Sequence, residues 1–344
     1  MPIRQDAPPR GRETAWFIGL TLPIAWGLAA IWLHDPSRWR IIQWVMCTPA
    51  LVGFALAFWF RREPPRAVGF AYTGWGPWVA AFLYPLAMAG CIVGLAYATR
   101  AATGDASFIH FQPAAVGFRR FGLARSGLAA IPPRLTWIAV LCLPAFLVAV
   151  AYRLRWPERV QAALPPRLRF LHHGLRALLF AQVIWFFPGP LAPPGSYGEE
   201  MGWRGYLVRR WASRPLVAAA ITAPVWAAFH IPVVFATAQR GNLLQNAFFL
   251  ASIAAAAVPF VALYLWARSI WPCAVLHLTW NFWNPFFLGD VYGGAPGMFG
   301  GRVWIFNGEG AFGLLVNGAV AAALLWRWRA AAASGTRLAA AQTV

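Results

Sequence analysis

Long apolar stretches separated by short charged segments run along the whole chain. Nine windows contain no Asp, Glu, Lys or Arg, and only two of them hold a histidine. They are Thr14–Leu33, Ile41–Phe60, Ala67–Thr99, Leu135–Tyr152, Ala177–Gly198, Pro215–Gln239, Gly241–Ala267, Ser269–Gly289 and Gly310–Trp326. Because a helix needs about 20 apolar residues to cross a bilayer, the pattern predicts eight or nine transmembrane helices.

Helices are favoured over strands because no strand-like alternation of apolar and polar residues appears. Lipid offers no hydrogen bonds, so backbone groups in the membrane must find partners within the protein. Composition agrees, since 60% of the residues are hydrophobic and 11% are charged, whereas soluble proteins carry roughly a quarter charged residues. We therefore expect an all-α, polytopic integral membrane protein whose active site lies inside the helix bundle.

The net charge of +19 comes from arginine alone, because the chain has no lysine. In a soluble protein such a charge would indicate nucleic acid. Here the arginines cluster at the ends of apolar windows, as in Arg61–Arg62, Arg153–Arg155 and Arg327–Arg329. This is typical of membrane anchors and of the positive-inside rule. We expect a bilayer partner, no nucleic acid, and a multi-pass protein of a bacterial cytoplasmic membrane with a cytoplasmic N-terminus.

Three regions are expected along the chain. Residues 1–170 hold N-terminal transmembrane helices and basic loops, including a short interfacial helix near Phe118–Ile131. Residues 171–290 hold the polar membrane residues and form the catalytic core. Residues 291–344 hold a final transmembrane helix and a basic tail. Within the core, the helix breakers of 188–196 predict a separate helix from Gly198 to Trp211, with acidic residues in its first turn.

Two adjacent glutamates, Glu199 and Glu200, stand out in a chain with ten acidic residues. On an α-helix, Glu200 and Arg204 lie one above the other and form a favourable i,i+4 ion pair. Glu199 lies at another angle and lacks that partner, so it is free to face a cavity. The structural alternative is an acidic first turn that only matches the helix dipole.

Two further windows place polar groups inside the membrane, where they are costly and mark functional sites. His230 lies deep in Pro215–Gln239, with Trp226 one turn earlier on the same face. His277 and Asn281 share one face of Ser269–Gly289. A packed core histidine and helix–helix hydrogen bonding are the structural alternatives. Together these groups supply a general base and oxyanion donors, a set that suits hydrolysis of an amide bond.

Other membrane hydrolases are disfavoured by their motifs. HExxH is absent, no second membrane aspartate accompanies the nearest approach to GxGD, and no serine has a nucleophile-like glycine setting.

The segments "GEEMGWRGYL", "VWAAFHIP" and "AVLHLTWN" resemble the CPBP intramembrane proteases, also called the Abi or type II CAAX prenyl endopeptidase family. The family pattern is EExxxR, F/WxxxH and HxxxN/D on three helices, and all three occur in that order. The wording "GEExGWRGY" is similar to a bacterial branch. The resemblance covers about Phe180 to Phe286, and Trp226 stands where many members have phenylalanine.

The resemblance implies a role for each matching residue. Glu199 would activate the attacking water with help from His230, and His277 and Asn281 would stabilise the oxyanion. Glu200 and Arg204 would hold the geometry of the site. If zinc is present, Glu199, His230 and His277 would be its ligands. We favour a metal-free site, because an asparagine suits an oxyanion donor better than a zinc ligand.

The leading prediction is an endopeptidase that cuts a peptide or lipid-modified protein near the bilayer surface. A proton- or solute-coupled transporter is the alternative from another class, although the paired halves common in transporters are not evident. A catalytically silent immunity or scaffold protein of the same family is the third possibility.

Overall fold

The computed structural model describes residues 11–35, 40–61, 63, 69, 71, 73–112, 194–236, 242–290 and 296–334. All of them belong to one compact unit, formed by residues 1–116 and 193–344. Three expectations therefore lie outside the described residues: the interfacial helix near Phe118–Ile131, the apolar window Leu135–Tyr152, and most of the window Ala177–Gly198.

The described chain is almost entirely helical, as expected. The long helices are α1 (Gly11–His34), α2 (Arg40–Phe54), α3 (Trp75–Thr103), α8 (Pro215–Ala236), α9 (Leu243–Ala267), α10 (Ile270–Leu288) and α12 (Ala311–Ala333). The shorter helices are η1 (Ala55–Phe60), α7 (Pro194–Glu200), η7 (Met201–Val208) and α11 (Val303–Phe306), of which η1 and η7 are π-helices.

Six helical segments of the described chain are long and apolar enough to cross a membrane. They are Gly11–His34, Ile41–Phe60, Trp75–Thr103, Pro215–Phe235, Leu243–Ala267 and Val303–Ala333. Each coincides closely with a predicted window, and the window Ser269–Gly289 forms α10. The all-α, polytopic fold is thus confirmed, while the count of eight or nine spans stays a prediction.

The helix that carries the two glutamates packs along α2. Its glycines make this contact possible, since a Cβ at Gly198 would lie 2.7 Å from the Cα of Cys47. A Cβ at Gly202 would collide with the backbone and ring of Pro49. The two backbones therefore touch, and α7 and η7 are held against α2 over their whole length.

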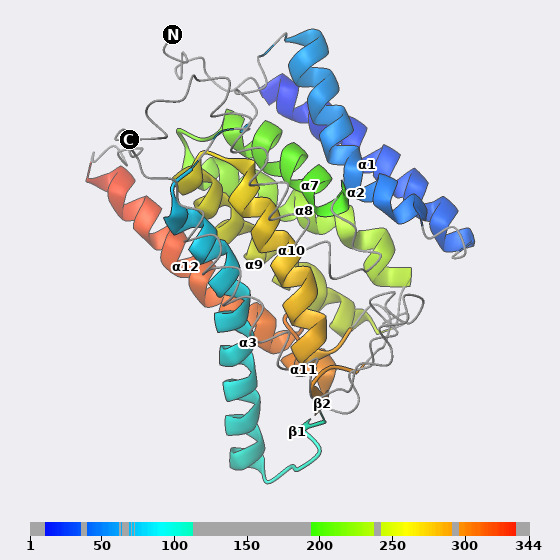
Figure 1. Cartoon of the computed structure of the whole chain (residues 1–344), viewed down its shortest axis with the longest axis vertical. Coiled ribbons are helices and arrows are strands. Elements are labelled where there is room, and N and C mark those ends of the chain that lie inside the picture. The colour runs from blue at the N-terminus through cyan, green and yellow to red at the C-terminus, as the bar shows by residue number, and fades with distance from the viewer. Residues whose placement is uncertain are drawn as a thin grey trace, which may run out of the picture. The chain divides into compact units, whose positions relative to one another are not determined.

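The remaining helices complete the surroundings of the site. α10 packs against α7, α8 and α9 pack against η7, and α3 and α12 lie beyond α9 and α10 (Figure 1). The outer faces of the described helices carry exposed apolar side chains, among them Trp59 of η1 (84% exposed), Leu83 of α3 and Trp326 of α12. Such faces suit contact with lipid, and the polar groups of the site lie on the inner faces.

A short antiparallel strand pair, β1 (Ile109–Phe111) with β2 (Phe299–Gly301), lies at the far end of α3. The sequence pattern did not predict it, because three-residue strands are too short to show alternation. Nearby, the buried side chain of Asn307 donates to the carbonyls of Leu288 and Gly289. Its Oδ1 accepts from Asn284 and from the backbone N–H of Glu309. This asparagine network joins α10 to the segment that leads into α12.

Candidate active site

The helix with the glutamates begins earlier than predicted. Residues 194–197 are already helical, ahead of the predicted start at Gly198. Glu199 and Glu200 therefore lie at the end of α7, where α-helical winding changes to the π-helical winding of η7. The expectation of acidic residues in the first turn was wrong, so the dipole explanation no longer accounts for them.

The predicted ion pair between Glu200 and Arg204 is present. The distance from Arg204 Nη1 to Glu200 Oε1 is 3.0 Å, and both side chains are completely buried. The guanidinium of Arg204 also lies between two aromatic rings, 4.3 Å from the ring centroid of Trp226 and 4.4 Å from that of Phe260. Cation–π contacts of this kind are strongest where the cation is desolvated. Glu200, Trp226 and Phe260 thus hold the guanidinium of Arg204 in place.

Arg204 pairs with Glu200, as expected, and Glu199 has a neutral hydrogen-bond partner that the sequence did not predict. The indole N–H of Trp226 on α8 donates to Glu199 Oε2 at 2.8 Å, and both residues are buried. The donor is neutral, so the carboxylate is oriented without being neutralised. With Glu200 balanced by Arg204, the negative charge of Glu199 has no counterion among the contacts described. A carboxylate in this position is suited to accepting a proton.

Each histidine uses its Nδ1 atom in a hydrogen bond. His277 Nδ1 lies 2.8 Å from Glu200 Oε1, and His230 Nδ1 lies 2.8 Å from the carbonyl oxygen of Trp226. Carboxylate and carbonyl oxygens only accept, so Nδ1 carries the proton in both rings. The Nε2 atoms are left for other partners. Glu199 also lies within electrostatic range of both imidazoles.

The structure therefore brings residues of α7, η7, α8 and α10 to one place. Asn281 lies one turn after His277 on α10 and is half-buried, but it makes no hydrogen bond to the other site residues in the described chain. Its role as an oxyanion donor stays a prediction.

Two aromatic residues were missing from the predicted site. Trp226 contacts Glu199 and Arg204, and its sequence signals were its position one turn before His230 and its place in the F/WxxxH pattern. Phe260 lies on α9 and covers both Arg204 and His277, with its ring centroid 6.0 Å from that of His277. Nothing in the uniformly apolar sequence of α9 marks this phenylalanine.

The residues of the zinc alternative do not form a ligand group. A catalytic zinc site needs three protein ligands around one point. Within the ranges that the structure describes, no three His, Cys, Asp or Glu side chains gather closely enough to hold a metal ion. Glu199, His230 and His277 are all described residues.

Comparison with known protein families gives a match over the segment that holds the candidate site. A family model described as type II CAAX prenyl endopeptidase Rce1-like matches residues 174–283, a segment that contains all six predicted site residues. This segment, about a third of the chain, is similar to the CPBP, or CAAX protease, family of membrane proteases. The match does not distinguish a bacterial branch. No curated protein and no solved structure matches the chain.

Proposed function

We propose that the protein is an intramembrane endopeptidase that hydrolyses a peptide bond of a membrane-associated or lipid-modified protein. The observation that carries the proposal is the placement of Glu199. It is a buried carboxylate, oriented by a neutral donor, beside a second carboxylate that is already paired. Arg204 pairs with Glu200, which leaves the carboxylate of Glu199 to accept a proton during the reaction.

In the proposed reaction, Glu199 takes a proton from water, and the oxygen of that water attacks the carbonyl carbon of the scissile bond. His230 donates from Nδ1 to Trp226, so its Nε2 is an acceptor that can help to orient the water. When His277 is protonated, Glu200 accepts from Nδ1 and the Nε2–H can donate to the oxyanion. Asn281 would add a second donor. Glu199 then returns its proton to the leaving amine.

The site lies among buried residues, and six described helices have the length and composition of membrane spans. A substrate must therefore present an extended segment at the membrane, which favours membrane-tethered peptides over soluble globular proteins. We expect the protein in a bacterial cytoplasmic membrane with its N-terminus in the cytoplasm.

A cleavage assay in a membrane tests the proposal. The purified protein in liposomes is offered a library of peptides with and without lipid anchors, and products are identified by mass spectrometry. We expect cleavage by the wild type and almost none by Glu199→Gln or His277→Ala. Equal cleavage by both variants contradicts the mechanism. Metal analysis of the same sample, with and without chelator, decides the metal question.

A further inference from the structure

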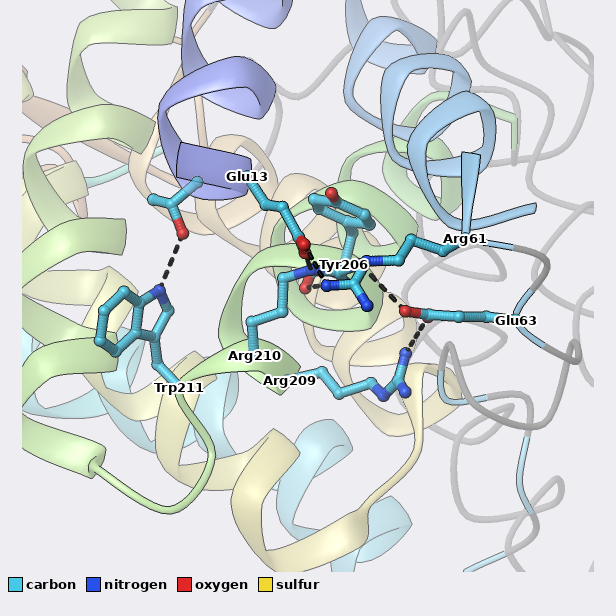
Figure 2. Close-up of polar contacts among 8 residues, drawn as sticks. Glu13, Arg61, Glu63, Tyr206, Arg209, Arg210 and Trp211 are labelled. Atoms are coloured by element: carbon cyan, nitrogen blue, oxygen red, sulfur yellow. Dashed lines mark hydrogen bonds and ion pairs between the residues drawn. The ribbon is translucent and has the colours of Figure 1, made fainter. Parts of the chain in front are cut away.

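A chain of five charged side chains lies at the end of η7, outside the site described above (Figure 2). The order is Arg61, Glu13, Arg210, Glu63 and Arg209, with each carboxylate bound by two arginines. Glu13 lies in the first turn of α1, Arg61 and Glu63 follow η1, and the two other arginines end the glutamate helix. We call this group the arginine clamp.

Arg210 is the centre of the arginine clamp, and only 8% of its side chain is exposed. Its Nε lies 3.2 Å from Glu13 Oε2, and its Nη2 lies 3.2 Å from Glu63 Oε1. The third nitrogen, Nη1, donates to the carbonyl oxygen of Tyr206 at 3.1 Å. One guanidinium thus joins α1, the segment after η1, and the backbone of η7 itself.

The ring of Tyr206 strengthens this connection. The guanidinium carbon of Arg210 lies 3.5 Å from the centroid of the Tyr206 ring. The same ring stacks on Phe17 of α1, with 4.9 Å between the two ring centroids. The next residue, Trp211, donates from its indole to Thr14 of α1 at 3.0 Å. Figure 2 shows these side chains converging from three segments on the end of one helix.

The winding of η7 explains why such an anchor matters. A π-helix is usually a single turn, because its i→i+5 hydrogen bonds are less favourable than α-helical ones, yet η7 extends over eight residues. If one π turn rewound as α-helix, every later side chain would move on by one position, about 100° around the axis. Arg209 and Arg210 would then no longer face Glu63 and Glu13.

Movement at the Arg210 end of η7 reaches the site because η7 is tightly packed between the two. All residues from Gly202 to Val208 are buried, and Gly202 touches Pro49 of α2. A shift of the end is therefore passed along the axis to Glu200 and Glu199.

We propose that Arg210, held by Glu13 and Glu63, is a positioning residue that fixes the register of the helix carrying Glu199 and Glu200. Its effect on cleavage rests on the proposed function above, whereas its effect on the winding of η7 does not. The two can therefore be measured separately.

The experiment compares Glu63→Gln, Glu13→Gln, the double variant and Arg210→Gln with the wild type in liposomes. Arg302→Gln is the matched control, because Arg302 forms an ion pair with Asp105 (2.7 Å) at the far end of α3, away from η7. Steady-state cleavage gives kcat and KM, and hydrogen exchange reports on the backbone amides of 201–208.

We expect the clamp variants to lower kcat by roughly ten- to hundredfold with little change in KM, since small displacements of reacting groups have effects of this size. Exchange should rise in 201–208 and stay unchanged in α3 and α12. Because Glu13 and Glu63 both act through Arg210, the double variant should be less impaired than the product of the two single effects. The control should match the wild type.

Wild-type kcat in folded Glu63→Gln protein overturns the proposal, as does an exchange increase spread evenly over the bundle. If the wild type cleaves no peptide, the proposed function fails, and exchange alone then decides the inference. Faster exchange confined to 201–208 supports positioning by the clamp, and unchanged exchange contradicts it.

Discussion

Replacing Trp226 by phenylalanine removes one donor from Glu199 and leaves an aromatic ring at the same place. The lost contact is the 2.8 Å hydrogen bond from the indole to the carboxylate, and Glu199 and Trp226 are 1% and 5% exposed. Trp226 gives Glu199 Oε2 the one hydrogen bond that it receives from the described residues, so phenylalanine leaves that oxygen without a protein donor. The phenyl ring can still lie against the guanidinium of Arg204, which keeps the ion pair with Glu200 in place.

A hydrogen bond to a buried charged group contributes about 2 kcal/mol. If this free energy orients the general base, Trp226→Phe should lower kcat by roughly thirtyfold. KM should stay within about twofold, because the lost hydrogen bond is made to Glu199 and not to the substrate. Because the phenyl ring still lies against Arg204, Trp226→Phe should lower the melting temperature only slightly.

The assay is steady-state cleavage in liposomes of the best peptide from the library. Trp266→Phe, on the exposed face of α9, is the control for the chemical change alone and should behave as the wild type. A Trp226→Phe enzyme with wild-type kcat would refute the reasoning, because Glu199 would then need no donor from α8.

Three further predictions concern the surroundings of the site. Arg204→Met leaves Glu200 buried without its counterion, so the free energy of unfolding should fall by about 3–5 kcal/mol in detergent denaturation; a change below about 1 kcal/mol contradicts a buried ion pair. Asn307→Ala removes the four hydrogen bonds of the asparagine network and should cost about 3 kcal/mol in the same assay, with kcat unchanged; a large loss of kcat would link this network to the chemistry. The hydroxyl of Ser107, together with its backbone N–H and nearby arginines, holds the pKa of Asp105 below its usual value. Stability from this group is therefore present above about pH 3.9 and lost as the pH falls through the lower folded pKa. The protection factor of the Ser107 amide, corrected for the intrinsic pH dependence of exchange, should therefore fall there in the wild type and not in Asp105→Asn.

The positions of the long helices were predictable because the bilayer sets their length, and apolar windows record it directly. The ends of these helices were less predictable. The window Ala67–Thr99 becomes a helix only from Trp75, because Gly69 instead pairs its carbonyl with the N–H of Ile270. At the other end the helix continues past Arg100, whose side chain reaches back to the carbonyl of Ile109. A tertiary contact thus accompanies the first end, and Gly104 in the left-handed conformation caps the second.

Within the site, the pair Glu200–Arg204 followed from spacing, since both residues lie on one helix. The bond from Trp226 to Glu199 did not, because it depends on how α8 lies against α7. Phe260 was invisible for the same reason. The π-helical winding of η7 has no sequence pattern of its own, and it is held by contacts with residues as distant as Glu13 and Glu63. The sequence thus predicted the polar residues of the candidate site, and the structure shows which contacts orient them.

The central claim is that Glu199 activates the water that breaks the peptide bond, and hydrolysis in ¹⁸O-labelled water tests it most directly. Wild-type protein in liposomes should place one ¹⁸O atom in the new carboxyl terminus of the product. Glu199→Gln protein, folded and still able to accept from Trp226, should do so at a rate lower by roughly 10²–10⁴. Label incorporation by Glu199→Gln at the wild-type rate would contradict the account.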